Sequence, residues 1–426
     1  MKRSAATLLV AVLLAAFGVR LAAACWWQSR HSGRFLFGDS ESYWVLARAV
    51  AHGGPYEFGS PDARVFRAPG YPLLLAPLFV FGGDQPPVLA ARVLGALLGT
   101  LAVAGVGWLA GRLFGPPAGF LAAGIATIEP GIAATSVMVL SEALFLPLVI
   151  LHLALWVAAW QARTSIRGAW LAAGAGLAAG VATLARPSWL LFAPLAILLA
   201  IVAGPQRKRH LEIGAVMLAG LVVAMLPWWI RNDCVIGRFV PTTLQVGASL
   251  YDGWNPQATG ASDMGFVARF VEEECARPAA GNDAGAPLEY RLDRRMRRAA
   301  IDWALDHPAA AVRLAAVKFV RIWNVWPNEK GLSAWPIRLA LTVTYVPIML
   351  LAALGAARTI RRGWPYVLCW LPAVYFTLLH TVFVGSIRYR MPAMLTLIVL
   401  AAGAASGGRW PVVGGWSGKK WHEGER

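Results

Sequence analysis

Long apolar stretches dominate the chain, and they recur at the length needed to cross a lipid bilayer. A hydrocarbon core about 30 Å thick requires roughly 20 apolar residues in a helix. Runs near that length predict about ten transmembrane helices, at 5–24, 88–111, 117–135, 139–160, 168–185, 188–204, 211–230, 338–357, 364–384 and 391–405. A shorter apolar run at 71–81 predicts a re-entrant or interfacial helix. The pattern therefore predicts an all-α, polytopic membrane protein.

Two polar stretches, 28–86 and 231–336, interrupt this pattern. In the first, apolar residues at helical spacing (Tyr43, Leu46, Ala47 and Val50) predict a helix over 40–51 that lies along the membrane surface. In the second, two amphipathic helices are expected at 288–306 and 309–325, divided by His307-Pro308. The predicted units are an N-terminal transmembrane module (1–230), a modest outer loop domain (231–336) that is helical in its second half, C-terminal transmembrane helices (337–405) and a tail (406–426).

The distribution of charged residues predicts which side of the membrane each connecting segment occupies. The chain is 58% hydrophobic, 14% charged and carries a net charge of +17. The two polar stretches hold 18 of the 39 basic and 17 of the 22 acidic residues, so the positive excess lies in the short connections and the tails. The positive-inside rule places those segments and both termini in the cytoplasm, which leaves both polar stretches outside. We expect an inner (plasma) membrane protein of a bacterium that contacts anionic lipid, not nucleic acid.

Ionisable residues collect near the predicted outer face, where hydrophobicity alone does not require them. Such groups are costly at membrane depth and usually face a cavity or a partner. Several arginines beside a few carboxylates suit an anionic, phosphate-bearing ligand held next to a general base. The candidates are Asp39, Glu41, Arg67, Tyr71, Glu142, Arg186, Arg231, Arg388, Tyr389 and Arg390.

Each candidate also has a structural explanation. Asp39 stands where it would cap the helix 40–51, and Glu41 would compensate the dipole of that helix. Arg67 and Arg186 could be anchors that extend to the membrane surface. Cys234 and Cys275 share the second polar stretch and either pair or remain free thiols. The sequence has no metal-binding spacing and requires no cofactor, although a divalent metal at Asp39 stays open.

An ordered set of motifs resembles glycosyltransferase family 39, which has the GT-C fold and includes protein mannosyltransferases and the lipid A aminoarabinose transferase. The motifs lie at 38–43, 66–72, 140–142, 184–187, 227–232, 249–256 and 388–392. The resemblance implies inverting transfer of a sugar, a hexose or a pentose, from a polyprenyl-phosphate donor to a lipid, glycan or protein acceptor outside the membrane. The resemblance also implies that Asp39 is the catalytic base. The adjacent acidic pair of the best-known members is replaced here by Asp39-Ser40-Glu41, and their Lys- or His-Pro-Pro by Arg67-Ala68-Pro69.

Simple chemistry agrees with this resemblance. Nucleotide sugars stay in the cytoplasm, so transfer on the outer face needs a donor carried by the membrane. Its leaving group is a lipid phosphate, which Arg67, Arg231, Arg388 and Arg390 would neutralise while Asp39 takes the acceptor's proton. Two alternatives remain at this stage: a transporter or flippase of lipid-linked sugars, and a membrane scaffold without chemistry. A transporter would be expected to carry paired repeats and charges at mid-bilayer.

Overall fold

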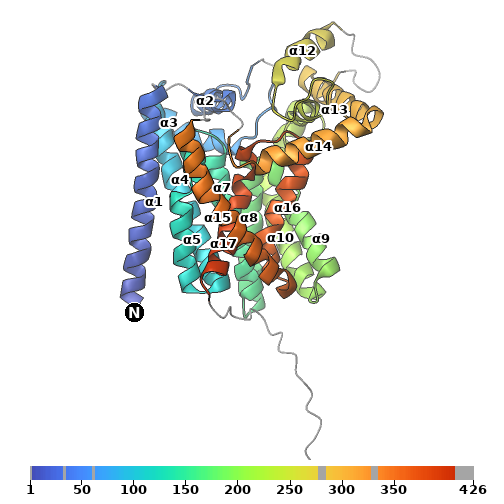
Figure 1. Ribbon diagram of the computed structural model, residues 1–426. Helices are drawn as coiled ribbons and strands as arrows, with labels where there is room; N and C mark the ends of the chain where they lie inside the picture. Colours follow the sequence, from blue (N-terminus) through green and yellow to red (C-terminus); the bar gives the residue numbers. More distant parts are fainter. Residues whose placement is uncertain (1, 32–34, 60–62, 277–284, 328–333, 408–426) are drawn as a thin grey trace, which may run out of the picture.

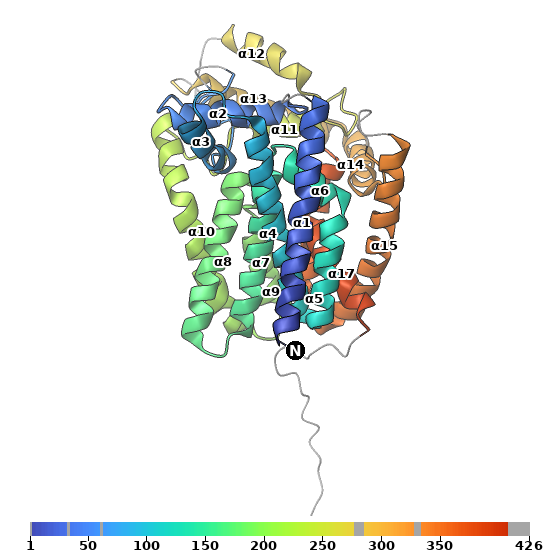
Figure 2. The ribbon, with the colours of Figure 1, turned by 90° about the vertical axis from the view of Figure 1, so that its left-hand side faces the viewer.

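The protein is a bundle of roughly parallel helices that carries a cap of shorter helices at one end (Figures 1 and 2). This computed structural model describes residues 2–31, 35–59, 63–276, 285–327 and 334–407. Every regular element within those ranges is a helix, which confirms the predicted all-α fold class. The N-terminus lies at the end of the bundle opposite the cap.

Seven helices in the described part of the chain are long and apolar enough to cross a membrane. The bent pair α5 (Pro116–Ile128) and α6 (Pro130–Val137) is an eighth candidate. Shorter apolar helices, α9 (Phe192–Ala203) and α16 (Val367–Val382), occupy two further predicted spans, so the expected number of about ten is approximate. The seven are α1 (Lys2–His31), α4 (Val88–Phe114), α7 (Glu142–Gln161), α8 (Ser165–Ala185), α10 (Arg207–Ile236), α15 (Trp335–Thr359) and α17 (Met391–Ala405).

The span expected at 117–135 is broken at Glu129. Pro130 follows directly, and a proline has no N–H to donate and disfavours helical geometry in the residue before it. Glu129 is extended there and caps α6, because its carboxylate accepts from the backbone N–H of Ile132 over 2.6 Å. The direction of the chain bends by 59° between α5 and α6. The apolar pattern crosses this break without a gap, which is why it predicted one straight helix.

The cap is built from the two polar stretches. Its elements are α2 (Gly38–Ala51), α3 (Gly70–Gly82), α11 (Val246–Gly253), α12 (Val267–Cys275), α13 (Leu288–Asp306) and α14 (Pro308–Trp323). The short helix expected at 71–81 is α3, and His307 divides α13 from α14 as predicted. In α2 the predicted apolar residues Tyr43, Leu46 and Ala47 are buried.

The expected role of Asp39 as a helix cap is wrong. Helix α2 begins one residue earlier, at Gly38, and its N-cap is Phe37, which makes no side-chain capping bond. Asp39 therefore lies inside the first turn, and its carboxylate is free to reach across to other segments.

Helix α17 occupies the centre of the bundle. Residues from Met391 to Ala404 are all buried, and the helix packs against α4, α5, α7, α15 and α16. A short 3-10 helix, η6 (Ile387–Arg390), precedes it at the capped end. The burial of α17 thus fixes the arginines of η6 at the middle of that end.

Candidate active site

The carboxylate of Asp39 is held between two arginines from distant parts of the chain. Nη2 of Arg67 lies 2.8 Å from Oδ1, and Nη1 of Arg388 lies 3.0 Å from Oδ2. Burial opposes the charge on Asp39, but the combined attraction of Arg388 and Arg67 outweighs it and holds the pKa of this carboxyl well below its usual range. Asp39 is therefore an ionised hydrogen-bond acceptor at neutral pH, and 31% of its side chain remains exposed.

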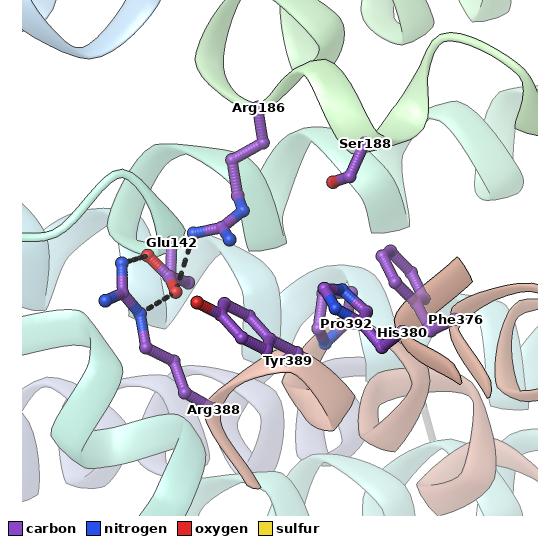
Figure 3. Close-up of a pocket in the computed structure, with 8 residues that line it drawn as sticks. All are labelled: Glu142, Arg186, Ser188, Phe376, His380, Arg388, Tyr389 and Pro392. Atoms are coloured by element: carbon purple, nitrogen blue, oxygen red, sulfur yellow. Dashed lines mark hydrogen bonds and ion pairs between the residues drawn. The ribbon is translucent and has the colours of Figure 1, made fainter. Parts of the chain in front are cut away.

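A second carboxylate, Glu142, lies behind the first and begins α7. Its side chain is only 1% exposed. Nη2 of Arg388 donates to its Oε2 over 3.0 Å, Nε of Arg388 contacts Oε1, and Nη1 of Arg186 lies 2.7 Å from Oε1 (Figure 3). Arg388 thus binds Glu142 with one edge of its guanidinium and reaches Asp39 with the other, which is the forked geometry that arginine favours.

Neutral side chains fix the orientation of this charged cluster. The Ser141 hydroxyl lies 3.2 Å from both the Tyr43 hydroxyl and Nη1 of Arg186. The ring of Tyr43 packs edge-on against Tyr71, which is buried behind it. The guanidinium of Arg186 lies 5.6 Å from the ring centre of Tyr389. Tyr71 and Tyr389 therefore act as walls of the cluster.

A small recess opens beside the cluster. Tyr389 forms one side and stacks on His380, with ring centres 4.3 Å apart. The hydroxyl of Ser188 is buried and has no hydrogen-bond partner among the residues that the structure describes. The lining residues are Glu142, Arg186, Ser188, Phe376, His380, Arg388, Tyr389 and Pro392 (Figure 3).

Arg231 and Arg390, two of the predicted arginines, lie apart from the carboxylates. Arg231 donates to the carbonyl of Arg64 over 3.1 Å and lies over the ring of Trp228. Arg390 is buried, donates to the carbonyl of Ile322 over 3.1 Å, and lies 3.8 Å from the ring centre of Tyr345. Each of these two arginines therefore joins its own segment to a distant one through a backbone carbonyl.

Glu41 also lies apart from the cluster. It follows Asp39 by two positions on α2, and residues at that spacing do not share a helix face. Its side chain is exposed, and it makes no ion pair with any residue in the described ranges. The structure thus brings Asp39, Arg67, Glu142, Arg186 and Arg388 together and leaves Glu41 outside.

Comparison with known proteins identifies the fold that carries this cluster. Residues 67–230 match the family of dolichyl-phosphate-mannose-protein mannosyltransferases. The archaeal oligosaccharyltransferase AglB from Archaeoglobus fulgidus, solved with an inhibitory peptide and a dolichol-phosphate, aligns with a TM-score of 0.59 at 15% identity, over 95% of this chain and 50% of that chain. The chain has the GT-C fold. The family resemblance predicted from the sequence motifs is thereby confirmed.

Comparison also finds similarity to two further structures. The same oligosaccharyltransferase in complex with Zn and sulfate aligns with a TM-score of 0.55 at 16% identity, over 93% of this chain and 48% of that chain. ArnT from Cupriavidus metallidurans, bound to undecaprenyl phosphate, aligns with a TM-score of 0.45 at 15% identity, over 93% and 76%. The GT-C chain described here spans about half the length of the oligosaccharyltransferase. No curated protein matches its sequence.

Sequence reasoning did not find Gln245, whose Oε1 accepts from Nη1 of Arg67 over 3.1 Å. This glutamine lies in a loop of the second polar stretch, and no local pattern separates it from other polar loop residues. Ser141 could have been predicted from the sequence, because it lies inside the motif at 140–142. His380 stands alone in an apolar run of the sequence, and in the structure it stacks on Tyr389 and lines the recess.

No metal is assigned to this GT-C site. Within the described ranges, no group of three His, Cys, Asp or Glu side chains is arranged to hold a metal ion. Both oxygens of Asp39 accept from arginines. All four cysteines, including Cys234 and Cys275, are free thiols.

Proposed function

We propose that this GT-C protein transfers a sugar from a polyprenyl-phosphate donor to an acceptor on the extracytoplasmic face of a bacterial plasma membrane. One observation carries the proposal: an ionised Asp39 is held between Arg67 and Arg388 at the capped end of the bundle. The positive-inside pattern supports an outward-facing cap and cytoplasmic termini. The dolichol-phosphate in the archaeal oligosaccharyltransferase supports a lipid phosphate as the carrier.

The arginines that lower the basicity of Asp39 are also the groups that would bind the donor phosphate. When that phosphate arrives, Arg67 and Arg388 share their hydrogen bonds with it, which weakens their hold on Asp39 and makes the carboxylate a better base. The acceptor hydroxyl then attacks the anomeric carbon from the face opposite the phosphate and gives its proton to Asp39. The bond between that carbon and the phosphate oxygen breaks, its electron pair stays on the lipid phosphate, and the anomeric configuration inverts.

Glu142 has a positioning role in this scheme. It is too buried to meet an acceptor, and it already binds both Arg388 and Arg186. A buried anion between two guanidinium groups keeps them at fixed angles, so that little reorganisation is needed when charge develops on the phosphate. Arg231 and Arg390 stabilise the surrounding segments.

The experiment is to reconstitute the purified full-length protein with a panel of hexosyl and pentosyl polyprenyl phosphates and measure release of the polyprenyl phosphate. Asp39→Asn should reduce release by at least about 100-fold, the lower range for loss of a general base. Asp84→Asn is the matched control, because Asp84 lies in the same polar stretch and pairs with His52, outside the charged cluster. Undiminished release by Asp39→Asn, or movement of a lipid-linked sugar across the membrane without release, would refute the proposal.

A further inference from the structure

The segment that carries Arg67 has no regular structure of its own, and other segments hold its backbone. Val65 is fully buried, and its carbonyl accepts from the backbone N–H of Leu244 over 3.0 Å. The carbonyl of Arg64 accepts from Arg231 over 3.1 Å. Every loop backbone group buried in this way needs a partner, and here the partners come from the second polar stretch.

The backbone N–H groups of Arg64 and Val65 in this segment share one hydrogen-bond acceptor, Glu289. Its Oε2 accepts from the N–H of Arg64 over 2.9 Å and from the N–H of Val65 over 3.0 Å, and Oε1 lies 3.1 Å from the N–H of Val65. Glu289 stands in the first turn of α13, more than 220 positions along the chain, and is 6% exposed. A buried carboxylate that accepts two backbone N–H groups fixes the position of that backbone firmly.

We infer that Glu289 is a positioning residue for the transfer reaction. Its hydrogen bonds to the backbone N–H groups of Arg64 and Val65 determine the position at which Arg67 contacts Asp39. The inference rests on the proposed function. Arg67 follows Val65 by two residues, so a shift of the gripped backbone moves the guanidinium with it. Placement errors near 1 Å at a reacting centre are enough to slow a reaction markedly.

The charge on Glu289 is finely balanced. Burial raises its pKa to about 7, although the N–H groups of Val65 and Arg64 and the charge of Arg231 act in the opposite direction. Asp293, one turn further along α13, adds to the increase. The Arg64 guanidinium pairs with Glu57 instead. Glu289 therefore changes protonation near neutral pH.

Protonation weakens the grip because one oxygen becomes an O–H donor and no longer accepts from an amide. Transfer should accordingly increase with pH through about 7. Asp39 cannot cause this change because its pKa lies well below the usual range. Burial lowers the pKa of Lys318 to about 8, but loss of its proton as the pH rises would only weaken its bond to the carbonyl of Val382, which gives no reason for transfer to increase.

Stability should respond to Glu289 in the opposite direction. A carboxyl whose pKa is higher in the folded state stabilises the fold most below its unfolded value, and this contribution is lost as the pH rises towards 7. Acidification from pH 8 to pH 6 should therefore slow transfer without a loss of stability due to this group. A residue with a purely structural role would make activity follow stability.

The test is the pH dependence of kcat and KM for the full-length protein, Glu289→Gln and Glu273→Gln. In the wild type kcat should fall about tenfold between pH 8 and pH 6, with little change in KM. Glu289→Gln should be slowed at pH 8 and lose this dependence. Glu273→Gln, a carboxylate on α12 that pairs with Arg295 outside the site, should keep the wild-type profile.

Hydrogen exchange of the wild-type protein is a second measurement that needs no variant to fold. After correction for intrinsic rates, the amides of Arg64 and Val65 should lose protection as the pH falls through about 7. Constant protection, or a Glu289→Gln variant that keeps both the wild-type rate and its pH dependence, would overturn the inference. Exchange is measured without any sugar donor, so it separates failure of this inference from failure of the proposed function.

Discussion

The guanidinium of Arg388 donates to the carboxylate of Asp39 over 3.0 Å, although 349 positions separate the two residues in the sequence. The same guanidinium binds Glu142 at the start of α7. Arg388 therefore joins the first cap helix, the bundle and the segment leading into α17. The site exists only when all three parts are folded together.

Replacing Arg388 should affect stability and activity separately, depending on the substitute. Arg388→Ala leaves Glu142 buried with one guanidinium fewer, and loss of one partner from a buried ion pair costs about 3–5 kcal/mol. Arg388→Lys keeps the charge but not the fork that spans both carboxylates, so we expect a folded protein with transfer reduced at least about 100-fold. Thermal unfolding and polyprenyl phosphate release measure the two effects.

A suitable control for Arg388→Lys is Arg112→Lys. Arg112 stands near the end of α4 distant from the site and donates to Gln161. This control should leave both readouts unchanged. Equal turnover of Arg388→Lys and the wild type would mean that the forked contact has no part in the reaction.

Arg67→Lys should lower kcat more than it changes stability. Arg67 divides its guanidinium between Asp39 and Gln245, and a lysine ammonium cannot hold both in one plane. We expect turnover to fall about 10- to 100-fold through loss of one preorganised donor. Arg48→Lys, an exposed residue on α2, is the control. A fall in donor affinity with unchanged kcat would instead assign Arg67 to ground-state binding.

Glu41→Gln distinguishes the two carboxylates of the Asp39-Ser40-Glu41 motif. Glu41 is exposed and stands on a different face of α2 from Asp39, so the variant should retain transfer within about threefold. Asp39→Asn, measured in the same membranes, should lose at least about 100-fold of the activity. If both variants lost activity equally, the second carboxylate would take part in the chemistry despite its position.

Most of the fold could be predicted because the lipid bilayer that surrounds the helices determines the hydrophobic pattern of the sequence. Lipid requires long apolar runs, and those runs mark α4, α7 and α8 within a few residues. The hydrophobic pattern alone did not predict the break at Glu129 or the short length of α9, since it records apolar character and not helix direction. Proline was the available signal at the break, because it follows Glu129 immediately.

The candidate site was predictable in its membership more than in its contacts. The motifs pointed to Asp39, Arg67 and Arg388, and the structure places these three together. They also pointed to Arg231 and Arg390, which share residue type and predicted side with the others but bind backbone carbonyls. Charge and sidedness can select candidates, whereas only the packing of α17 and the second polar stretch decides which arginine faces which carboxylate.

Gly176→Ala should destabilise the bundle and disturb the site from a distance. Helices α8 and α10 approach so closely that a Cβ at Gly176 would lie 1.9 Å from the carbonyl oxygen of Met217. Small residues four apart allow such contacts between membrane helices, and Gly180 is the next one on α8. Because backbone must move, we expect a loss of about 1–3 kcal/mol, the usual cost of overpacking.

The matched control is Gly124→Ala on α5, where an added Cβ would meet nothing within 4 Å. Alanine is the better helix former, so this variant should be as stable as the wild type or more stable by up to about 1 kcal/mol. Thermal unfolding in detergent measures both variants. Helix α8 ends at Ala185, directly before Arg186, so separating α8 from α10 should also move Arg186 away from Glu142 and lower turnover. Equal unfolding temperatures for the two variants would mean that α8 and α10 do not pack through their glycines.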